Sequence, residues 1–239
     1  MAAFNECTNT DTPYEAKLYL QIVYMFVGLG TKVLLELFLY LLKHDEINMS
    51  LVDFLKSNET KQKLIKLRND KVINEKEHRL AKADNPKTDD FDISLLLILM
   101  RNLLPNEILS PPTHGWTKPP PRTDNTISAD LLRLRKIRND IIAHITRPQI
   151  PEPKYDRTRD ELIHIFYRLT QKIHPCKSKD AIMKEIQERI DSYQVSVDSP
   201  LTNLYISRVQ EWNLNFTKKV EESLKTLNEF DLYLTNRSK

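Results

Sequence analysis

The chain has 239 residues, a formal net charge of +3 and 40% hydrophobic residues, enough apolar side chains for one substantial core. Three glycines are too few for the tight turns of a β-sandwich, and two cysteines are too few for a disulfide scaffold or a structural zinc site. Leucine, lysine, glutamate and isoleucine dominate, so we expect an all-α fold. The two cysteines, Cys7 and Cys176, and the lack of a secretory signal pattern favour a cytoplasmic location.

The first predicted helix begins near Thr12. Residues 1–12 show no apolar periodicity, and we expect them to form a flexible leader. Thr12 is predicted to cap the helix, with Pro13 in its first turn and Glu15 completing a capping box. We therefore place the start of a helical domain at residue 13.

The run from Leu18 to Leu42 is long enough to be a transmembrane helix. It contains Lys32 and Glu36, each of which would cost about 2.5–3.5 kcal/mol at the centre of a bilayer. The two charges lie one helical turn apart, so they can pair on a soluble helix. We therefore expect a buried helix that bends near Gly28 and Gly30, and no association with a membrane.

A second apolar helix follows several short ones. Predicted helical segments cover 50–56, 59–68 and the charged stretch 71–80, ahead of a polar loop at 81–89. The segment from Asp90 to Leu104 is apolar on almost every face, which is typical of a helix at the centre of a domain. Arg101 and Asn102 suit its C-terminal turn, and a direct functional role for them is the alternative.

The connection from Leu104 to Thr126 holds six of the thirteen prolines. A loop of this length inside a compact domain is often functional or packed by its own side chains. Its single tryptophan, Trp116, is predicted to anchor the loop on the helices, because a tryptophan usually buries its ring. The alternative is that Trp116 stacks on a nucleobase.

The segment from Ser128 to Arg147 is predicted as the helix around which the domain is organised. Ser128 or Asp130 is expected to cap its start. Helical spacing places one group of apolar residues on a single buried stripe: Leu131, Leu134, Ile141, Ile142 and Ile145. Arg138 falls in the middle of this stripe, where a guanidinium is costly unless it is paired or hydrogen-bonded. Such a break in the pattern tends to mark function or strain.

His144 follows Arg138 by six residues, which is about 120° around and about 9 Å along an ideal helix. A second copy of the helix across a twofold interface would bring the two side chains together. The same segment has a local excess of positive charge over the single carboxylate of Asp140. The basic residues are Arg133, Arg135, Lys136, Arg138 and Arg147.

Further amphipathic helices are predicted over 155–174 and 178–193, and Pro200 can open a last long helix. That last helix is either a strap back onto the domain or a short coiled-coil seam. We divide the chain into a helical domain at 13–176 and a C-terminal helical extension at 177–239. The extension offers surfaces for protein partners.

The sequence has no phosphate loop, no dinucleotide fingerprint, no H-E-x-x-H and no paired C-x-x-C, so we expect no metal and no cofactor. The run I-R-N-D-I-I-A-H, from Ile137 to His144, resembles the R-N-x-x-x-x-H signature of the HEPN superfamily of helical nucleotide-binding domains. Two blocks precede it in order, D-F-D-I-S-L-L-L-I-L-M-R-N-L-L and S-P-P-T-H-G-W-T-K-P-P-P-R-T-D. Together the three blocks are similar to the DZIP3-like HEPN branch, named after the DAZ-interacting zinc-finger protein, over residues 18–174.

This resemblance implies a helical bundle that forms a homodimer with the two signatures facing each other. It implies RNA binding or metal-independent RNA cleavage, in which His144 moves a proton, Arg138 stabilises charge on the phosphate and Asn139 positions either group. Arg133, Arg135 and Lys136 would guide the RNA backbone electrostatically. The resemblance is equally compatible with a non-catalytic dimerisation or adaptor module of a multidomain signalling or innate-defence protein.

Overall fold

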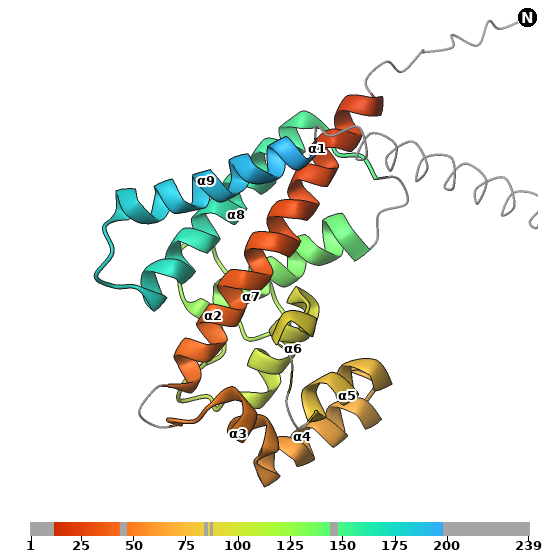
Figure 1. Ribbon diagram of the computed structural model, residues 1–239, viewed down its shortest axis with the longest axis vertical. Coiled ribbons are helices and arrows are strands. Elements are labelled where there is room, and N and C mark those ends of the chain that lie inside the picture. The colour runs from red at the N-terminus through yellow and green to blue at the C-terminus, as the bar shows by residue number, and fades with distance from the viewer. Residues whose placement is uncertain (1–11, 44–46, 84–85, 87, 144–147, 198–239) are drawn as a thin grey trace, which may run out of the picture.

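The computed structural model describes residues 12–43, 47–83, 86, 88–143 and 148–197 (Figure 1). Every regular element in these ranges is a helix, which confirms the predicted all-α class. The elements are α1 (Thr12–Tyr24), π-helical η1 (Met25–Leu29), α2 (Gly30–Leu42), α3 (Leu51–Lys56), α4 (Asn58–Asn69), α5 (Glu75–Lys82), 3₁₀-helical η2 (Thr88–Asp90), α6 (Ile93–Leu103), α7 (Ile127–Ile137), π-helical η3 (Arg138–Ala143), α8 (Glu152–Ile173) and α9 (Lys179–Val197).

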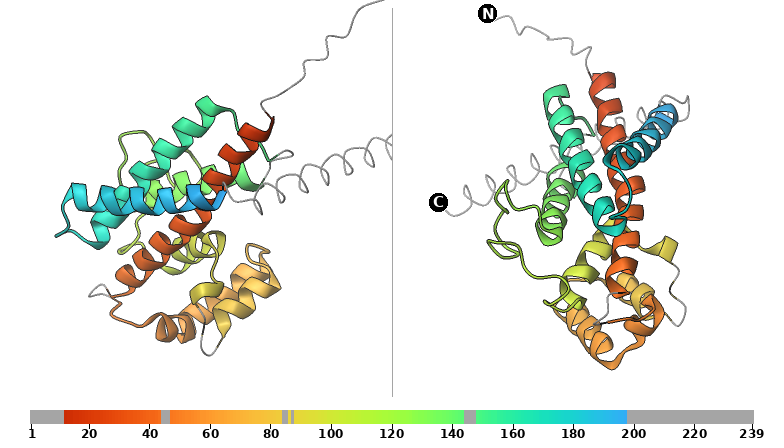
Figure 2. Two further views of the ribbon diagram at one scale, coloured as in Figure 1. Left: turned by 45° about the horizontal axis from the view of Figure 1, so that its top comes forward. Right: turned by 90° about the vertical axis from the view of Figure 1, so that its left-hand side faces the viewer.

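The segment α1–η1–α2 is a single long rod through the molecule, and the other helices pack around it (Figures 1 and 2). The helices α8 and α9 cover one part of the rod, whereas α6 packs on α2, and the short helices α3 and α4 contact α2 and α6, respectively. The helix α7 lies between α6 and α8. The rod therefore supplies the centre of the core.

The rod is long and apolar enough to cross a membrane by length and composition, over Tyr14–Leu42, and half of its most apolar window is buried inside the domain. Lys32 is exposed and Glu36 is half-buried. Fully buried side chains lie along its whole length: Ile22, Phe26, Leu34, Leu37, Phe38 and Leu42.

The two glycines at which a bend is predicted lie at the π-helical turn η1, which includes Gly28 and ends just before Gly30. Gly30 is buried, and a Cβ atom on it would lie 2.7 Å from Cδ1 of Ile93 and 3.4 Å from Cζ of Phe166. The glycine therefore lets α6 and α8 approach the rod closely at one level. This contact fixes the position of α6, on which the candidate site is built.

The helix α9 follows the predicted domain boundary at residue 176, and it packs against α1, η1 and α8. Ile182, Ile186 and Ile190 of α9 are buried in the same core as the other helices. The division at residue 176 stays a prediction. The helix proposed to begin at Pro200 and the leader at 1–11 lie outside the described residues.

His78 is a buried titratable side chain on α5. It is 3% exposed, and its Nε2 atom has no hydrogen-bond partner among the residues that the structure describes. Burial lowers the pKa of His78 from its ordinary value of 6.5, and the nearby Arg68 lowers it further. The unfolded chain therefore binds this proton at a higher pH than the folded chain.

Acidification from pH 7.5 to pH 5.5 is expected to reduce the stability of the fold, and His78→Leu is expected to lessen that reduction. As the pH falls below about 6.5, His78 takes up a proton in the unfolded state first, so the free energy of unfolding decreases. Urea unfolding at both pH values measures the difference. The exposed His164→Leu is the control and should keep the full wild-type loss. Equal losses in the wild type and in His78→Leu would contradict the assignment.

Candidate nucleic-acid interface

The helix α7 begins at Ile127 and is capped by Thr126, whose Oγ1 accepts a hydrogen bond from the backbone N–H of Ala129 at 3.2 Å. The prediction that Ser128 or Asp130 caps this helix is wrong. Both side chains are buried, and Ser128 Oγ donates a hydrogen bond to the carbonyl oxygen of Ser110. The side chains of Ser128 and Asp130 therefore make tertiary contacts and do not cap α7.

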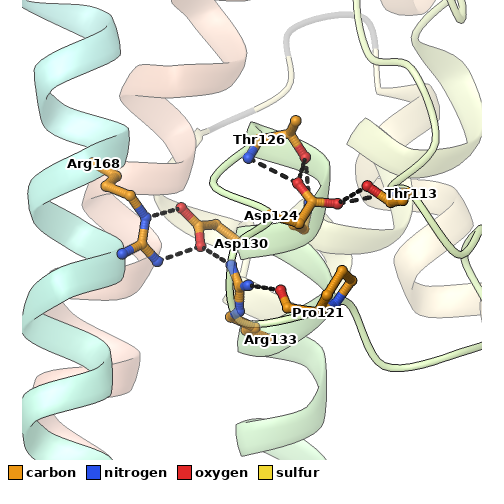
Figure 3. A network of polar contacts seen from close by, with 8 residues as sticks. Thr113, Pro121, Asp124, Thr126, Asp130, Arg133 and Arg168 are labelled. Atoms are coloured by element: carbon orange, nitrogen blue, oxygen red, sulfur yellow. Dashed lines mark hydrogen bonds and ion pairs between the residues drawn. The ribbon is translucent and has the colours of Figure 1, made fainter.

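Asp130 is fully buried and joins three elements (Figure 3). Its carboxylate accepts hydrogen bonds from Nε of Arg168 at 2.8 Å and from Nη2 of Arg168 at 2.6 Å. It also accepts one from Nη1 of Arg133 at 2.8 Å. Arg133 in turn donates from Nη2 to the carbonyl oxygen of Pro121 at 2.7 Å. Asp130 thus connects α7 to α8 directly and to the proline-rich loop through Arg133.

Arg133 differs from the expectation that it contacts RNA. Its side chain is 11% exposed, and its two terminal nitrogens are bonded to Asp130 and Pro121. These contacts hold the loop against α7. We therefore assign Arg133 to the wall of the site and leave it out of the proposed RNA contacts.

Asp124 fixes the end of the same loop. Its carboxylate accepts hydrogen bonds from the backbone N–H and the hydroxyl of Thr113, and from the same two groups of Thr126 (Figure 3). These hydrogen bonds hold the pKa of Asp124 well below its ordinary value. Because the four donors come from both ends of the loop, Asp124 closes residues 113–126 into a defined shape.

Trp116 packs against the hydrophobic core, as predicted for an anchor of the loop. The guanidinium carbon of Arg101 lies 5.5 Å from the centre of its ring, within the range of a cation–π contact. Burial lowers the pKa of Arg101, and the nearby positive charge of Arg135 lowers it further. Arg101 and Arg135 therefore form a pair of like charges, which a bound anion would stabilise.

Two adjoining cavities open beside these arginines. The loop cavity has a volume of about 410 Å³ and lies between the proline-rich loop and α7. The signature cavity has a volume of about 510 Å³ and lies between α6, η3 and the residues around α5. Arg101, Arg135 and Asn139 line both cavities, so the two adjoin at these residues, and we refer to them together as the groove.

The lining of this groove is strongly positive. Two carboxylates, Asp140 and Glu77, face it, and Glu77 also accepts a hydrogen bond in the cap of α5. Six cationic side chains line it: Arg101, Lys118, Arg133, Arg135, Lys136 and Arg138. Sequence reasoning did not include Lys118 and treated Arg101 as part of a helix end. Lys118 and Arg101 line the groove because the proline-rich loop and the end of α6 both lie beside the Arg138–Asn139 pair.

Arg138 lies at the start of η3 and is half-buried in the wall of the signature cavity. Its Nε donates to Oγ of Ser94 at 3.2 Å, and its Nη1 donates to Oδ1 of Asn139 at 3.2 Å. No carboxylate of the described residues pairs with it. Leu134 and Ile141 of the predicted stripe are buried, and the guanidinium of Arg138 is hydrogen-bonded at the wall of the cavity, as the sequence requires of a guanidinium at this position.

The segment Arg138–Ala143 is π-helical, so the angular spacing of an ideal α-helix does not apply between Arg138 and His144. His144 and Arg147 lie outside the described residues. Of the predicted catalytic set, the structure brings Arg138 and Asn139 together. Of the predicted backbone contacts, Arg135 lies at the junction of the two cavities and Lys136 lines the loop cavity.

Fold and groove together define an all-α domain with a positively charged cleft beside an Arg-Asn pair. The family model described as DZIP3/hRUL138-like HEPN matches residues 48–196, which is more than half of the chain. The chain belongs to this family.

Two curated relatives match shorter segments. The chain is 30% identical to the E3 ubiquitin-protein ligase DZIP3 of Mus musculus over 113 residues, which are 47% of this chain and 9% of that protein. It is 32% identical to the Homo sapiens protein of the same name over 84 residues, which are 35% of this chain and 7% of that protein. The chain thus spans less than a tenth of the length of either relative. No solved structure matches it significantly.

Proposed function

We propose that the chain is an RNA-binding HEPN domain that holds the ribose-phosphate backbone in its groove. One observation carries this proposal: five cationic side chains besides the internally paired Arg133, against two carboxylates, line two adjoining cavities that share Asn139. Electrostatic contacts to phosphates supply most of the affinity for nucleic acids, and the 2′-hydroxyl distinguishes RNA from DNA. The mutual repulsion of Arg101 and Arg135 is relieved when a phosphate lies between them.

We further propose that the bound strand is cut without a metal when two protomers bring their signatures together. His144 would remove the proton of a ribose 2′-hydroxyl, whose oxygen attacks the adjacent phosphorus. The bond from phosphorus to the 5′-oxygen breaks, and that oxygen receives a proton, which leaves a cyclic phosphate and a 5′-hydroxyl. Arg138 would stabilise the charge that develops on the phosphate, since its contacts with Ser94 and Asn139 use Nε and Nη1, and Nη2 has no partner among the described residues.

The binding step is tested with labelled single-stranded RNA in EDTA at several salt concentrations. We expect Arg135→Glu to weaken binding at least tenfold and to reduce the salt dependence, because each phosphate contact contributes about 0.7 to the logarithmic slope. Lys66→Glu is the matched control, since Lys66 is exposed on α4 and lines neither cavity. It should bind like the wild type. Equal affinities of the two variants would contradict the assignment of the groove.

The cleavage step is tested on the same samples. Arg138→Ala and His144→Ala are each expected to reduce the cleavage rate at least a hundredfold while leaving the fold intact, as is typical for the loss of a general acid–base or charge-stabilising group. Light scattering should give twice the chain mass of 28.1 kDa. RNA binding without any cleavage would contradict the proposed cleavage and retain the proposed RNA binding. Absence of both would favour the adaptor function, with contacts through residues 177–239.

A further inference from the structure

The loop cavity and the signature cavity differ in chemistry although they share one positive wall. The signature cavity is bordered by the Arg138–Asn139 pair and by Ser94, and its apolar lining consists of the aliphatic side chains of Val72, Leu97 and Ile98. The loop cavity also has apolar walls, formed by Trp116, the two adjacent prolines Pro119 and Pro120, and Leu132 of α7. The loop cavity differs in offering the flat faces of an indole ring and two proline rings, and these faces indicate a ligand with a flat apolar part.

The dimensions and the lining leave room for a nucleobase together with the ribose that carries it. The cavity volume of about 410 Å³ lies within the range of small-molecule sites. Lys118 and Lys136 contribute cationic side chains to its lining, and Arg135 is shared with the signature cavity. Asn139 and Asp140 add a hydrogen-bond donor and acceptors to the lining, which suit the polar edge of a base.

The cavity is also preformed. The carboxylate of Asp124 closes the loop through Thr113 and Thr126, and Arg133 ties Pro121 to α7. Gly115 has a φ of +73°, and its N–H donates to the carbonyl oxygen of Pro112 at 2.7 Å, which shapes the turn beside Trp116. A wall held in this way loses little conformational entropy when a ligand enters.

We propose that the loop cavity binds one unpaired nucleobase of the RNA strand whose phosphate lies against Arg101 and Arg135. This inference rests on the proposed function and adds a base-recognition subsite to it. The base lies between the proline walls and Leu132, and the adjoining phosphodiester bond passes into the signature cavity. Double-stranded RNA is excluded from the cavity because its bases are paired and stacked.

The experiment compares two non-cleavable probes of equal length, a 2′-O-methyl oligouridylate and the same 2′-O-methyl ribose-phosphate strand without bases. We expect the full wild-type chain to bind the oligouridylate about tenfold more tightly, as is typical for one base stacked on a protein surface. Leu132→Trp, which fills the cavity, should remove this difference while retaining the affinity for the abasic strand. Ile65→Trp is the matched control, because Ile65 is exposed on α4 and lines neither cavity.

Leu132→Ala serves as a second variant that removes the wall without adding bulk, and thermal melting confirms that each variant is folded. Equal binding of both probes by the wild type would overturn the base subsite and leave the proposed RNA binding intact. A preference that persists unchanged in both Leu132 variants would place the base elsewhere and also overturn it. Failure of the wild type to bind either probe while it binds unmodified single-stranded RNA would also overturn the base subsite, and failure to bind all three would overturn both proposals.

Discussion

Replacing Asp130 by alanine is expected to lower the free energy of unfolding by about 3–5 kcal/mol, the usual cost of removing one partner from a buried ion pair. The carboxylate is 1% exposed and accepts hydrogen bonds from two arginines. Its removal leaves the guanidinium of Arg133, which is 11% exposed, without a counter-charge. It also breaks the connection between α7 and α8.

Chemical denaturation with urea at neutral pH measures this loss. Asp160→Ala is the matched control, because Asp160 is 64% exposed and pairs with Arg159 only at 3.4 Å. An exposed pair of this kind contributes less than about 1 kcal/mol. The double variant Asp130→Ala with Arg133→Met should recover part of the stability, since it no longer buries an unpaired charge. A loss for Asp130→Ala as small as that of the control would contradict the structural role of the network.

Replacing Phe166 by alanine is expected to lower the free energy of unfolding by about 3–5 kcal/mol, because it leaves a cavity in the core. Phe166 is fully buried on α8, and its ring lies directly above Gly30 of the rod. Phe166→Leu retains most of the volume and should cost clearly less. Urea unfolding of both variants, with the exposed Tyr40→Ala as a control, tests the prediction.

A larger residue at position 30 tests the same contact from the other side. Gly30→Leu in the wild type must displace Ile93 and then meets the ring of Phe166, so we expect overpacking to cost stability. In the Phe166→Ala background the added side chain enters the space that the ring vacated. The two effects should therefore be strongly non-additive. Simple additivity would show that Gly30 and Phe166 do not share one packing site.

The order and class of the helices could be predicted because their apolar periodicity is local. The rod, the central helix α6 and the amphipathic α8 all appear in the sequence as long apolar patterns. The cap of α7 could not be assigned correctly, since Thr126, Ser128 and Asp130 are all good capping residues. Only the tertiary partners of Ser128 and Asp130, which lie on the loop and on α8, decide between them.

The candidate site could be predicted in its centre and not in its surroundings. The Arg138–Asn139 pair is visible as a motif, whereas Lys118 and Arg101 join it only through the path of the proline-rich loop. Arg133 illustrates the opposite case. Its sequence position among other basic residues suggests a ligand contact, but a carboxylate and a carbonyl from within the domain use its terminal nitrogens.

The rod also has a consequence for the synthesis of the protein. A ribosome releases Tyr14–Leu42 long before it makes α6 and α8, the helices that cover this segment. During that interval the nascent chain exposes an apolar segment with the length and composition of a membrane-spanning helix. We therefore expect this segment to stay exposed until Ile173 has emerged, and fragments that end before Glu152 should aggregate or associate with lipid.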